Sequence, residues 1–163
     1  PLAAGCAVAE AVESVASGMT VQVKWPNDVL VSGKKIAGIL CETRRMCILI
    51  GIGLNIQEEK FSFSGKTAPT SLYLETGNQH DVSDVYRMLL KKLSALLSLH
   101  DVPERIQARL YGLGCKAIVS VGAAGSAETL QGIIAGIAAD GALLIDTSQG
   151  RQSIYTGEIR KLL

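Results

Sequence analysis

Residues 24–42 read K-W-P-N-D-V-L-V-S-G-K-K-I-A-G-I-L-C-E. Two apolar runs, at 29–31 and at 36–40, lie on either side of polar residues at 32–34. Short apolar runs joined by a polar turn that contains glycine are typical of a β-hairpin. We therefore predict a hairpin over this stretch, and its polar residues are the first candidates for chemistry.

The polar residues of this hairpin are spaced so that they can share one site. Pro26 fixes its own φ and favours an extended residue before it, which presents Asn27 and Asp28 at the mouth of the first strand. Lys35 follows Asp28 by seven residues, so a tight hairpin returns it toward the carboxylate. Gly38 permits close approach of a ligand or of backbone. Taken one at a time, these residues also fit an ordinary solvated hairpin.

The next apolar segment, residues 46–53, is nearly continuous. Such a run predicts a strand that is buried on both faces. Gly51 and Gly53 lie two residues apart and therefore face the same way, as a bare strip where a ligand can touch backbone. Asn55 ends the run, and its amide, which can both donate and accept, suits recognition of a polar ring such as adenine. Residues 57–69 have no clear period and are interpreted as a loop.

The remaining segments predict several helices and short strands. Apolar residues at helical spacing favour helices in the first two thirds of the chain, with Thr70 or a neighbour and Ser83 as candidate caps. From Cys115 onward the pattern changes to short β segments separated by glycine-containing turns. We therefore divide the chain into residues 1–114 and 115–163. The expected helices are 2–17, 70–75, 82–99 and 103–110, and the further expected strands are 20–24, 117–121, 129–137, 142–145 and 152–155.

The composition favours a globular protein that binds a small molecule and another protein. The chain has 163 residues, of which 48% are hydrophobic, enough for one domain and a small second module. Its formal net charge is +1, which gives no basic footprint for nucleic acid. The apolar runs are too short to span a bilayer, so we expect a cytoplasmic protein without a membrane segment. Four cysteines without C-x-x-C spacing favour reduced, buried thiols.

Three motifs together resemble the catalytic domain of biotin protein ligases. They are K-W-P-N-D at 24–28, G-K-K-I-A-G-I-L-C-E at 33–42 and I-G-I-G-L-N-I at 50–56, in the family's order and spacing. G-E-I at 157–159 is similar to part of the family's terminal module. The resemblance covers essentially the whole chain. It implies an α+β fold in which a mixed or antiparallel β-sheet packs with helices and is followed by a small SH3-like β-barrel.

The resemblance implies an ATP-dependent biotin protein ligase. In the first step of this reaction a biotin carboxylate attacks the α-phosphate of ATP, giving biotinyl-5′-AMP and pyrophosphate, with Mg²⁺ as the metal. In the second step a lysine of a biotin carboxyl carrier protein, or of such a domain in a carboxylase, attacks the acyl carbon. Some family members pair two copies through an exposed sheet edge, so a homodimer is compatible with the resemblance.

The resemblance also assigns roles to residues of this chain. Lys35 matches the lysine that contacts the biotin carboxylate and the adenylate phosphate, where a fixed cation stabilises the transition state. Asp28 would orient the acceptor lysine or accept a proton from it. Asn27 would organise the nucleotide or Mg²⁺. The remaining assignments are Gly38, Gly51 and Gly53 on the biotin side, Asn55 at the adenine, and Arg160 at the nucleotide.

The chain also departs from the family's pattern. The Gly-Arg-rich loop that folds over the adenylate and the upstream biotin-ring contacts are not found in this sequence, so we expect a fragment that holds about half of the active site. No N-terminal helix-turn-helix is present in it either. Two alternatives stay open. One is a lipoate or other acyl-protein ligase, which shares the Asn-Asp pair and the Lys-x-x-Gly pattern, and the other is a non-catalytic module that binds biotinyl-adenylate or a partner.

Overall fold

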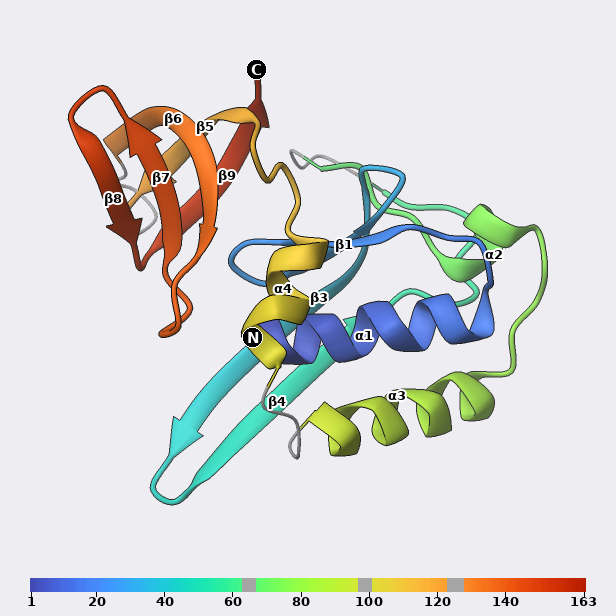
Figure 1. Cartoon of the computed structure of the whole chain (residues 1–163). Coiled ribbons are helices and arrows are strands. Elements are labelled where there is room, and N and C mark those ends of the chain that lie inside the picture. The colour runs from blue at the N-terminus through green and yellow to red at the C-terminus, as the bar shows by residue number, and fades with distance from the viewer. Residues whose placement is uncertain (63–66, 97–100, 123–127) are drawn as a thin grey trace.

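The computed structural model describes residues 1–62, 67–96, 101–122 and 128–163, which form two antiparallel sheets and four helices (Figure 1). The first sheet has the strand order β1-β2-β3-β4, and the second has the order β8-β7-β6-β5-β9. The α+β class is therefore confirmed. The helices are α1 (Leu2–Val15), α2 (Leu72–Thr76), α3 (Val82–Leu96) and α4 (Val102–Arg109). The strands are β1 (Val21–Lys24), β2 (Asp28–Val31), β3 (Lys34–Arg44), β4 (Cys47–Leu54), β5 (Lys116–Val121), β6 (Glu128–Ile137), β7 (Leu143–Thr147), β8 (Gly150–Ile154) and β9 (Gly157–Leu162).

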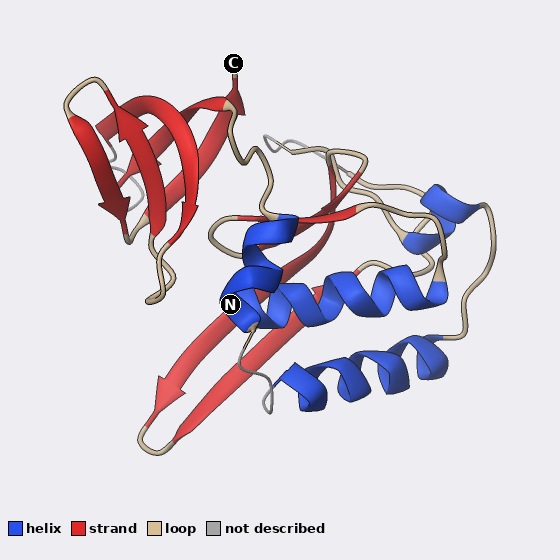
Figure 2. Cartoon of the chain, in the orientation of Figure 1, coloured by secondary structure: helices blue, strands red, loops and turns tan. Residues whose placement is uncertain are grey.

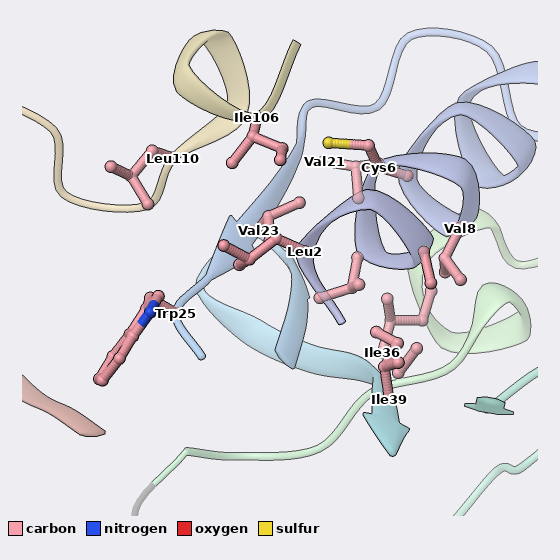
Figure 3. Close-up of a cluster of buried hydrophobic side chains, with 14 of the residues drawn as sticks. Leu2, Cys6, Val8, Val21, Val23, Trp25, Ile36, Ile39, Ile106 and Leu110 are labelled. Carbon is pink, nitrogen blue, oxygen red and sulfur yellow. The ribbon is translucent and has the colours of Figure 1, made fainter. Parts of the chain in front are cut away.

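Helix α1 forms the centre of the main core. It packs against the first sheet and against both α3 and α4, so most of its residues are buried. Small residues let it lie close to the sheet, since a Cβ atom on Gly5 would stand only 3.3 Å from a methyl group of Val23. Figure 3 shows side chains from α1, β1, β3 and α4 that meet in one buried cluster. The helix predicted over 2–17 is confirmed, although it ends at Val15.

The predicted hairpin is confirmed as β2 and β3. Val31 pairs with Lys34, and the two residues between them, Ser32 and Gly33, have φ values of 52° and 74°. Two consecutive positive φ values are typical of a type I′ turn, whose twist suits a tight hairpin. The turn therefore has only two residues, and it fixes the register of the hairpin.

Strand β4 corrects a prediction. The apolar run at 46–53 predicted a strand buried on both faces, yet Ile48 is 65% exposed and Leu49 is 52% exposed. The reason is topological, because β4 is an edge strand of the first sheet, and the outer part of the β3–β4 hairpin extends beyond the helices (Figure 1). A run of apolar residues indicates a strand but does not say whether anything packs on it.

The predicted helices are present with shifted ends and caps. The short helix begins after Ser71, whose hydroxyl accepts a hydrogen bond from the Leu74 backbone N–H at 3.1 Å. Helix α3 begins after Asp81, which accepts from the backbone N–H of Ser83 at 2.7 Å, so the predicted cap Ser83 is wrong. Residues 97–99 of the predicted third helix lie outside the described residues. None of the helices in the described ranges is long and apolar enough to cross a membrane.

The second sheet contains the strands predicted after Cys115 and one more, β9, that the pattern did not predict. Figure 2 shows this part of the molecule as strands and loops beside the helical part. Its core is apolar and formed by alternating residues such as Val119, Ile145 and Ile159. Within the described residues β8 and β9 are the two edges of the sheet and do not pair, so closure into an SH3-like barrel stays a prediction. The boundary between residues 114 and 115 also stays a prediction.

The cysteines only partly follow the prediction of buried thiols. Cys6 in α1 is fully buried, and this burial raises the pKa of its thiol to about 11. Cys41 is partly buried, whereas Cys47 and Cys115 are exposed. Cys47 is exposed for the same reason as its neighbours in β4, because the edge strand has no cover in the described part of the chain.

Candidate functional site

Lys35 and Asp28 form an ion pair across the β2–β3 hairpin. The distance between Lys35 Nζ and Asp28 Oδ1 is 2.5 Å, and the carboxylate is the more buried of the two, with 17% of its side chain exposed. The pair lies over Gly38, where an added Cβ atom would stand 3.2 Å from both Cε and Nζ of Lys35. The predicted meeting of these residues is therefore confirmed, and glycine leaves the space that the lysine occupies.

A β-bulge explains why Lys35 lies on this face. Asp28 pairs with Gly38 and Val29 with Ala37, but Leu30 then pairs with Lys35, so Ile36 is the extra residue. Without this shift, alternation would put residue 36 on the face of Gly38 and turn residue 35 to the opposite face. The bulge thus brings a lysine and a glycine that are three positions apart onto one side of the sheet.

A cavity of about 340 Å³ adjoins this ion pair. Its size is within the range of small-molecule sites. One wall comes from β3 and β4, and the other comes from residues that precede α2. The lining residues are Lys35, Ala37, Gly38, Gly53, Asn55, Phe61, Ser62, Thr67 and Pro69.

The glycines of β4 form the bare strip that the sequence predicted. Gly53 pairs with Gly38 and Gly51 pairs with Leu40, so both β4 glycines share the face of the ion pair. Added Cβ atoms would meet nothing closer than the Gly38 carbonyl at 4.0 Å and the Leu40 carbonyl at 3.8 Å, respectively. Gly53 lines the cavity, whereas Gly51 lies one step further out along the strand.

The second wall of the cavity is fixed to β3 by backbone hydrogen bonds. The N–H of Lys35 donates to the Ala68 carbonyl at 2.8 Å, and the N–H of Thr70 donates to the Lys35 carbonyl at 2.8 Å. Pro69 lies between these two bonds, where its missing N–H costs no hydrogen bond. The predicted loop at 57–69 therefore supplies cavity residues, which its irregular sequence did not indicate.

Asn55 holds the two walls together. Its side-chain N–H donates to the Thr70 carbonyl at 2.9 Å, and its backbone N–H donates to the Ile36 carbonyl at 3.0 Å. In the described part of the chain no protein group donates to its side-chain oxygen. The residue lines the cavity with an acceptor available for a ligand donor, and its contact with adenine stays a prediction.

Asn27 does not lie with the other predicted site residues at the Lys35 cavity. Its side-chain N–H donates to the Ile39 carbonyl at 2.9 Å, and its own carbonyl accepts from the Ile39 N–H at the same distance. These two hydrogen bonds attach the segment between β1 and β2 to β3. Asn27 is not among the residues that line the cavity. Its contact with a nucleotide or Mg²⁺ stays a prediction.

Arg160 lines another cavity, of about 290 Å³, between the first sheet and β9. This cavity also contains Lys24, which is only 4% exposed although lysine is usually a surface residue. The ammonium group of Lys24 lies 3.2 Å from the Thr67 hydroxyl and 3.6 Å from the Glu158 carboxylate. The structure therefore does not bring Arg160 to Lys35, although Thr67 lines both cavities.

Comparison with known proteins identifies two family segments in the expected order. The Biotin/lipoate A/B protein ligase family matches residues 2–55, and the Biotin protein ligase C terminal domain matches residues 120–162. The two matches together support a biotin protein ligase that includes the C-terminal domain. The first segment includes the Asp28–Lys35 pair, both β4 glycines and Asn55, so the family match and the site geometry concern the same residues.

Relatives and solved structures agree with this family. The chain is 32% identical to the Bifunctional ligase/repressor BirA of Bacillus subtilis, over 97% of this chain and 51% of that protein. It is also 32% identical to the Biotin--[acetyl-CoA-carboxylase] ligase of Paracoccus denitrificans, over 84% of this chain and 61% of that one. The structure of the biotin protein ligase from Aquifex aeolicus in complex with biotin and ATP matches with a TM-score of 0.84 and 29% identity, over 100% of this chain and 70% of that one. The chain thus spans about half the length of the Bacillus relative.

The predicted site residues divide into those that lie together and those that do not. Among the described residues four of them line one cavity, a fifth forms an ion pair with one of these four, and three lie outside this group. Those at the cavity or its ion pair are Asp28, Lys35, Gly38, Gly53 and Asn55. Those outside are Asn27, Gly51 and Arg160. Sequence reasoning missed the wall residues Phe61, Thr67 and Pro69, because they lie in a segment without periodicity.

Proposed function

We propose that this chain carries part of the acyl-adenylation and transfer centre of a biotin protein ligase. The protein would form biotinyl-5′-AMP from biotin and ATP and transfer biotin to a lysine of a biotin carboxyl carrier protein or domain. The observation that carries this proposal is the Lys35 ammonium group, held over the bare backbone of Gly38 at the edge of a cavity of ligand size. The Aquifex relative in complex with biotin and ATP supports the choice of ligands.

The first step requires a cation where negative charge gathers on oxygen. As the biotin carboxylate attacks the α-phosphate, charge develops on the phosphoryl oxygens and pyrophosphate leaves. An ammonium group has three N–H donors, and Asp28 occupies one of those of Lys35. Two donors remain for the biotin carboxylate and the α-phosphate. A positioned donor of this kind stabilises the transition state more than the ground state.

The second step requires an uncharged amine on the acceptor. The acceptor lysine must lose a proton before its nitrogen can attack the acyl carbon, and AMP then leaves. Asp28 is the carboxylate nearest to Lys35, and it keeps one oxygen that is not the partner in the 2.5 Å contact. We assign this oxygen to orienting the incoming amine or accepting its proton.

Magnesium would accompany ATP. The described residues contain no cluster of three or more His, Cys, Asp or Glu that could hold a metal ion by itself. Mg²⁺ typically uses few protein ligands and mostly phosphate and water oxygens in nucleotide sites. Asn27 is the group we assign to it, through the side-chain oxygen, because its side-chain N–H is bonded to Ile39.

The Paracoccus relative, whose name specifies an acetyl-CoA-carboxylase substrate, supports a carboxylase carrier domain as the acceptor. A lipoate ligase is the second candidate, because the family that matches residues 2–55 includes both biotin and lipoate enzymes. Pairing of two copies and a cytoplasmic location stay predictions. The β4 edge strand would be open for such pairing in the described structure.

ATP–pyrophosphate exchange tests the proposal directly. The assay uses the longest natural product of the gene that includes this chain, with biotin, lipoate or neither. We expect exchange that requires biotin. Exchange that requires lipoate would move the chain to the second candidate function, and no exchange with either would favour a binding module without ligase activity.

A further inference from the structure

The chain's single tryptophan joins the site to the second sheet. Trp25 is 2% exposed, and its indole N–H donates to the backbone carbonyl of Gly141 at 3.2 Å. Gly141 lies in the turn between β6 and β7, 116 residues further along the chain. Figure 3 shows the ring at one edge of the buried cluster, away from the side chains of α1.

The turn that accepts this hydrogen bond is itself held in place. Asp140 accepts hydrogen bonds from the Ala142 backbone N–H at 3.2 Å and from the Tyr155 hydroxyl at 3.0 Å. Gly141 has a φ of 89° and donates its own N–H to the Ala138 carbonyl at 2.9 Å. The Gly141 carbonyl is therefore a fixed acceptor, not the end of a loose loop.

Trp25 also lies close in sequence to the site. Two residues further on, Asn27 is clamped to Ile39, and Asp28 then pairs with Lys35. The residue before the tryptophan, Lys24, reaches Glu158 of β9 at 3.6 Å. The loop is thus anchored to the second sheet at its start and to β3 at its end.

We propose that the β6–β7 turn positions Asp28 opposite Lys35 through the buried indole of Trp25. In the described part of the chain the second sheet does not line the Lys35 cavity, so it would act on Asp28 indirectly, and the Trp25 hydrogen bond links it to the segment that precedes Asp28. Trp25 is a positioning residue in this scheme and touches no substrate. The catalytic consequence rests on the proposed function, whereas the effect on the ion pair does not.

The first test measures the ion pair without any ligand. The lysines of Trp25→Phe are labelled with an amine-reactive acylating reagent, and the rate at Lys35 is compared with that at the exposed Lys116. The phenyl ring keeps most of the packing and removes the N–H donor. We expect the relative labelling of Lys35 to rise about threefold or more, since the loss of an ordinary hydrogen bond corresponds to a factor of roughly 2 to 10. Tyr111→Phe is the matched control, because it lies beside the first sheet and its hydroxyl has no partner among the described residues.

The second test measures catalysis in the longest natural product of the gene. Because a displacement of about 1 Å can cost roughly a hundredfold, we expect Trp25→Phe to lower the kcat of biotin-dependent exchange about tenfold, with less than about a twofold change in KM for biotin and ATP. Asp140→Ala, which loosens the turn, should act in the same direction. A general loss of folded protein would not change the Lys35-to-Lys116 labelling ratio of the folded fraction.

The outcomes separate the two proposals. If Trp25→Phe and Tyr111→Phe give the same labelling ratio and the same kcat, the positioning proposal is overturned. If the unmodified protein shows no biotin-dependent exchange, the proposed function fails, and the labelling ratio alone decides whether the turn positions the ion pair. A raised ratio in both Trp25→Phe and Asp140→Ala, with Tyr111→Phe unchanged, supports it.

Discussion

The two halves of β3 differ in what packs against them. In the inner half, Ile36 and Ile39 are buried against α1, and the polar residue Lys35 has a defined partner and cavity. In the outer half, Leu40 is 63% exposed, and its β4 neighbours are exposed as well. The site therefore depends on α1, which packs on the opposite face of the sheet. Where α1 covers the sheet, the opposite face can hold a lysine, a carboxylate and a glycine in fixed positions.

The largest expected effect is a difference in the free energy of unfolding between variants of the inner and outer parts of the β3–β4 hairpin. Ile39→Ala removes a side chain that is 2% exposed, and we expect a loss of about 2 to 5 kcal/mol in the free energy of unfolding. Ile48→Ala, on the same face but 65% exposed, should cost less than about 1 kcal/mol. Urea unfolding of both variants measures the difference. Equal losses would mean that the outer hairpin is packed as well.

A change at the carboxylate should separate the two chemical steps. Asp28→Asn keeps the size of the side chain but removes the proton acceptor, so we expect transfer to an acceptor lysine to fall by about a hundredfold or more. Adenylation should fall by less than about tenfold, since Lys35 keeps an oxygen partner at this position. Exchange and transfer assays on the same preparation give the two rates. An equal loss in both steps would contradict the role of Asp28 in transfer.

Two glycine variants should separate the effect of moving Lys35 from the effect of filling the cavity. A methyl group on Gly38 would stand 3.2 Å from the end of the Lys35 side chain, so Gly38→Ala should displace the lysine and lower kcat about tenfold. Gly53→Ala meets no close atom and places its methyl group at the cavity, so it should raise KM for biotin. Steady-state exchange kinetics test both. The reverse assignment of kcat and KM would mean that the ligand does not lie along this strip.

The smallest effect concerns the support of the hairpin turn. Burial acts to raise the pKa of Glu75, but hydrogen bonds from Thr70 and Lys34 outweigh it and hold this pKa below the usual 4.5. A carboxylate with a lowered pKa stabilises the fold above its unfolded-state pKa, and this contribution is lost as the pH falls through the folded-state value. Glu75→Gln should therefore lower the Tm near neutral pH, and this difference should shrink below about pH 4. Glu42→Gln, on the exposed outer half, is the control and should leave the Tm near neutral pH almost unchanged.

Sequence reasoning predicted the inner half because its determinants are local. The Ser32-Gly33 turn, the alternation on both sides of it and the seven-residue spacing of Asp28 and Lys35 all lie within one hairpin. The β-bulge was not predicted, since either register fits the same apolar pattern. It nevertheless decides which face Lys35 occupies.

The features that sequence reasoning missed depend on distant contacts. The burial of Lys24 depends on Glu158 and Thr67, and that of Trp25 involves Gly141. The exposure of β4 depends on the extent of helical cover, which the strand itself does not encode. Arg160 was assigned to the nucleotide by resemblance, and only the three-dimensional arrangement separates its cavity from that of Lys35.

Two adjacent lysines at the start of β3 allow the most direct test. Lys35 faces the cavity, whereas Lys34 forms an ion pair with Glu75 at 2.9 Å and does not line the cavity. Biotin-dependent ATP–pyrophosphate exchange should fall by about a hundredfold or more in Lys35→Ala, as expected for one positioned electrostatic donor. Lys34→Ala, which removes the same charge one residue away, should stay within about threefold, since an exposed ion pair contributes roughly 0 to 1 kcal/mol. Near-normal exchange in Lys35→Ala, or equal loss in both variants, would contradict the assignment of the site.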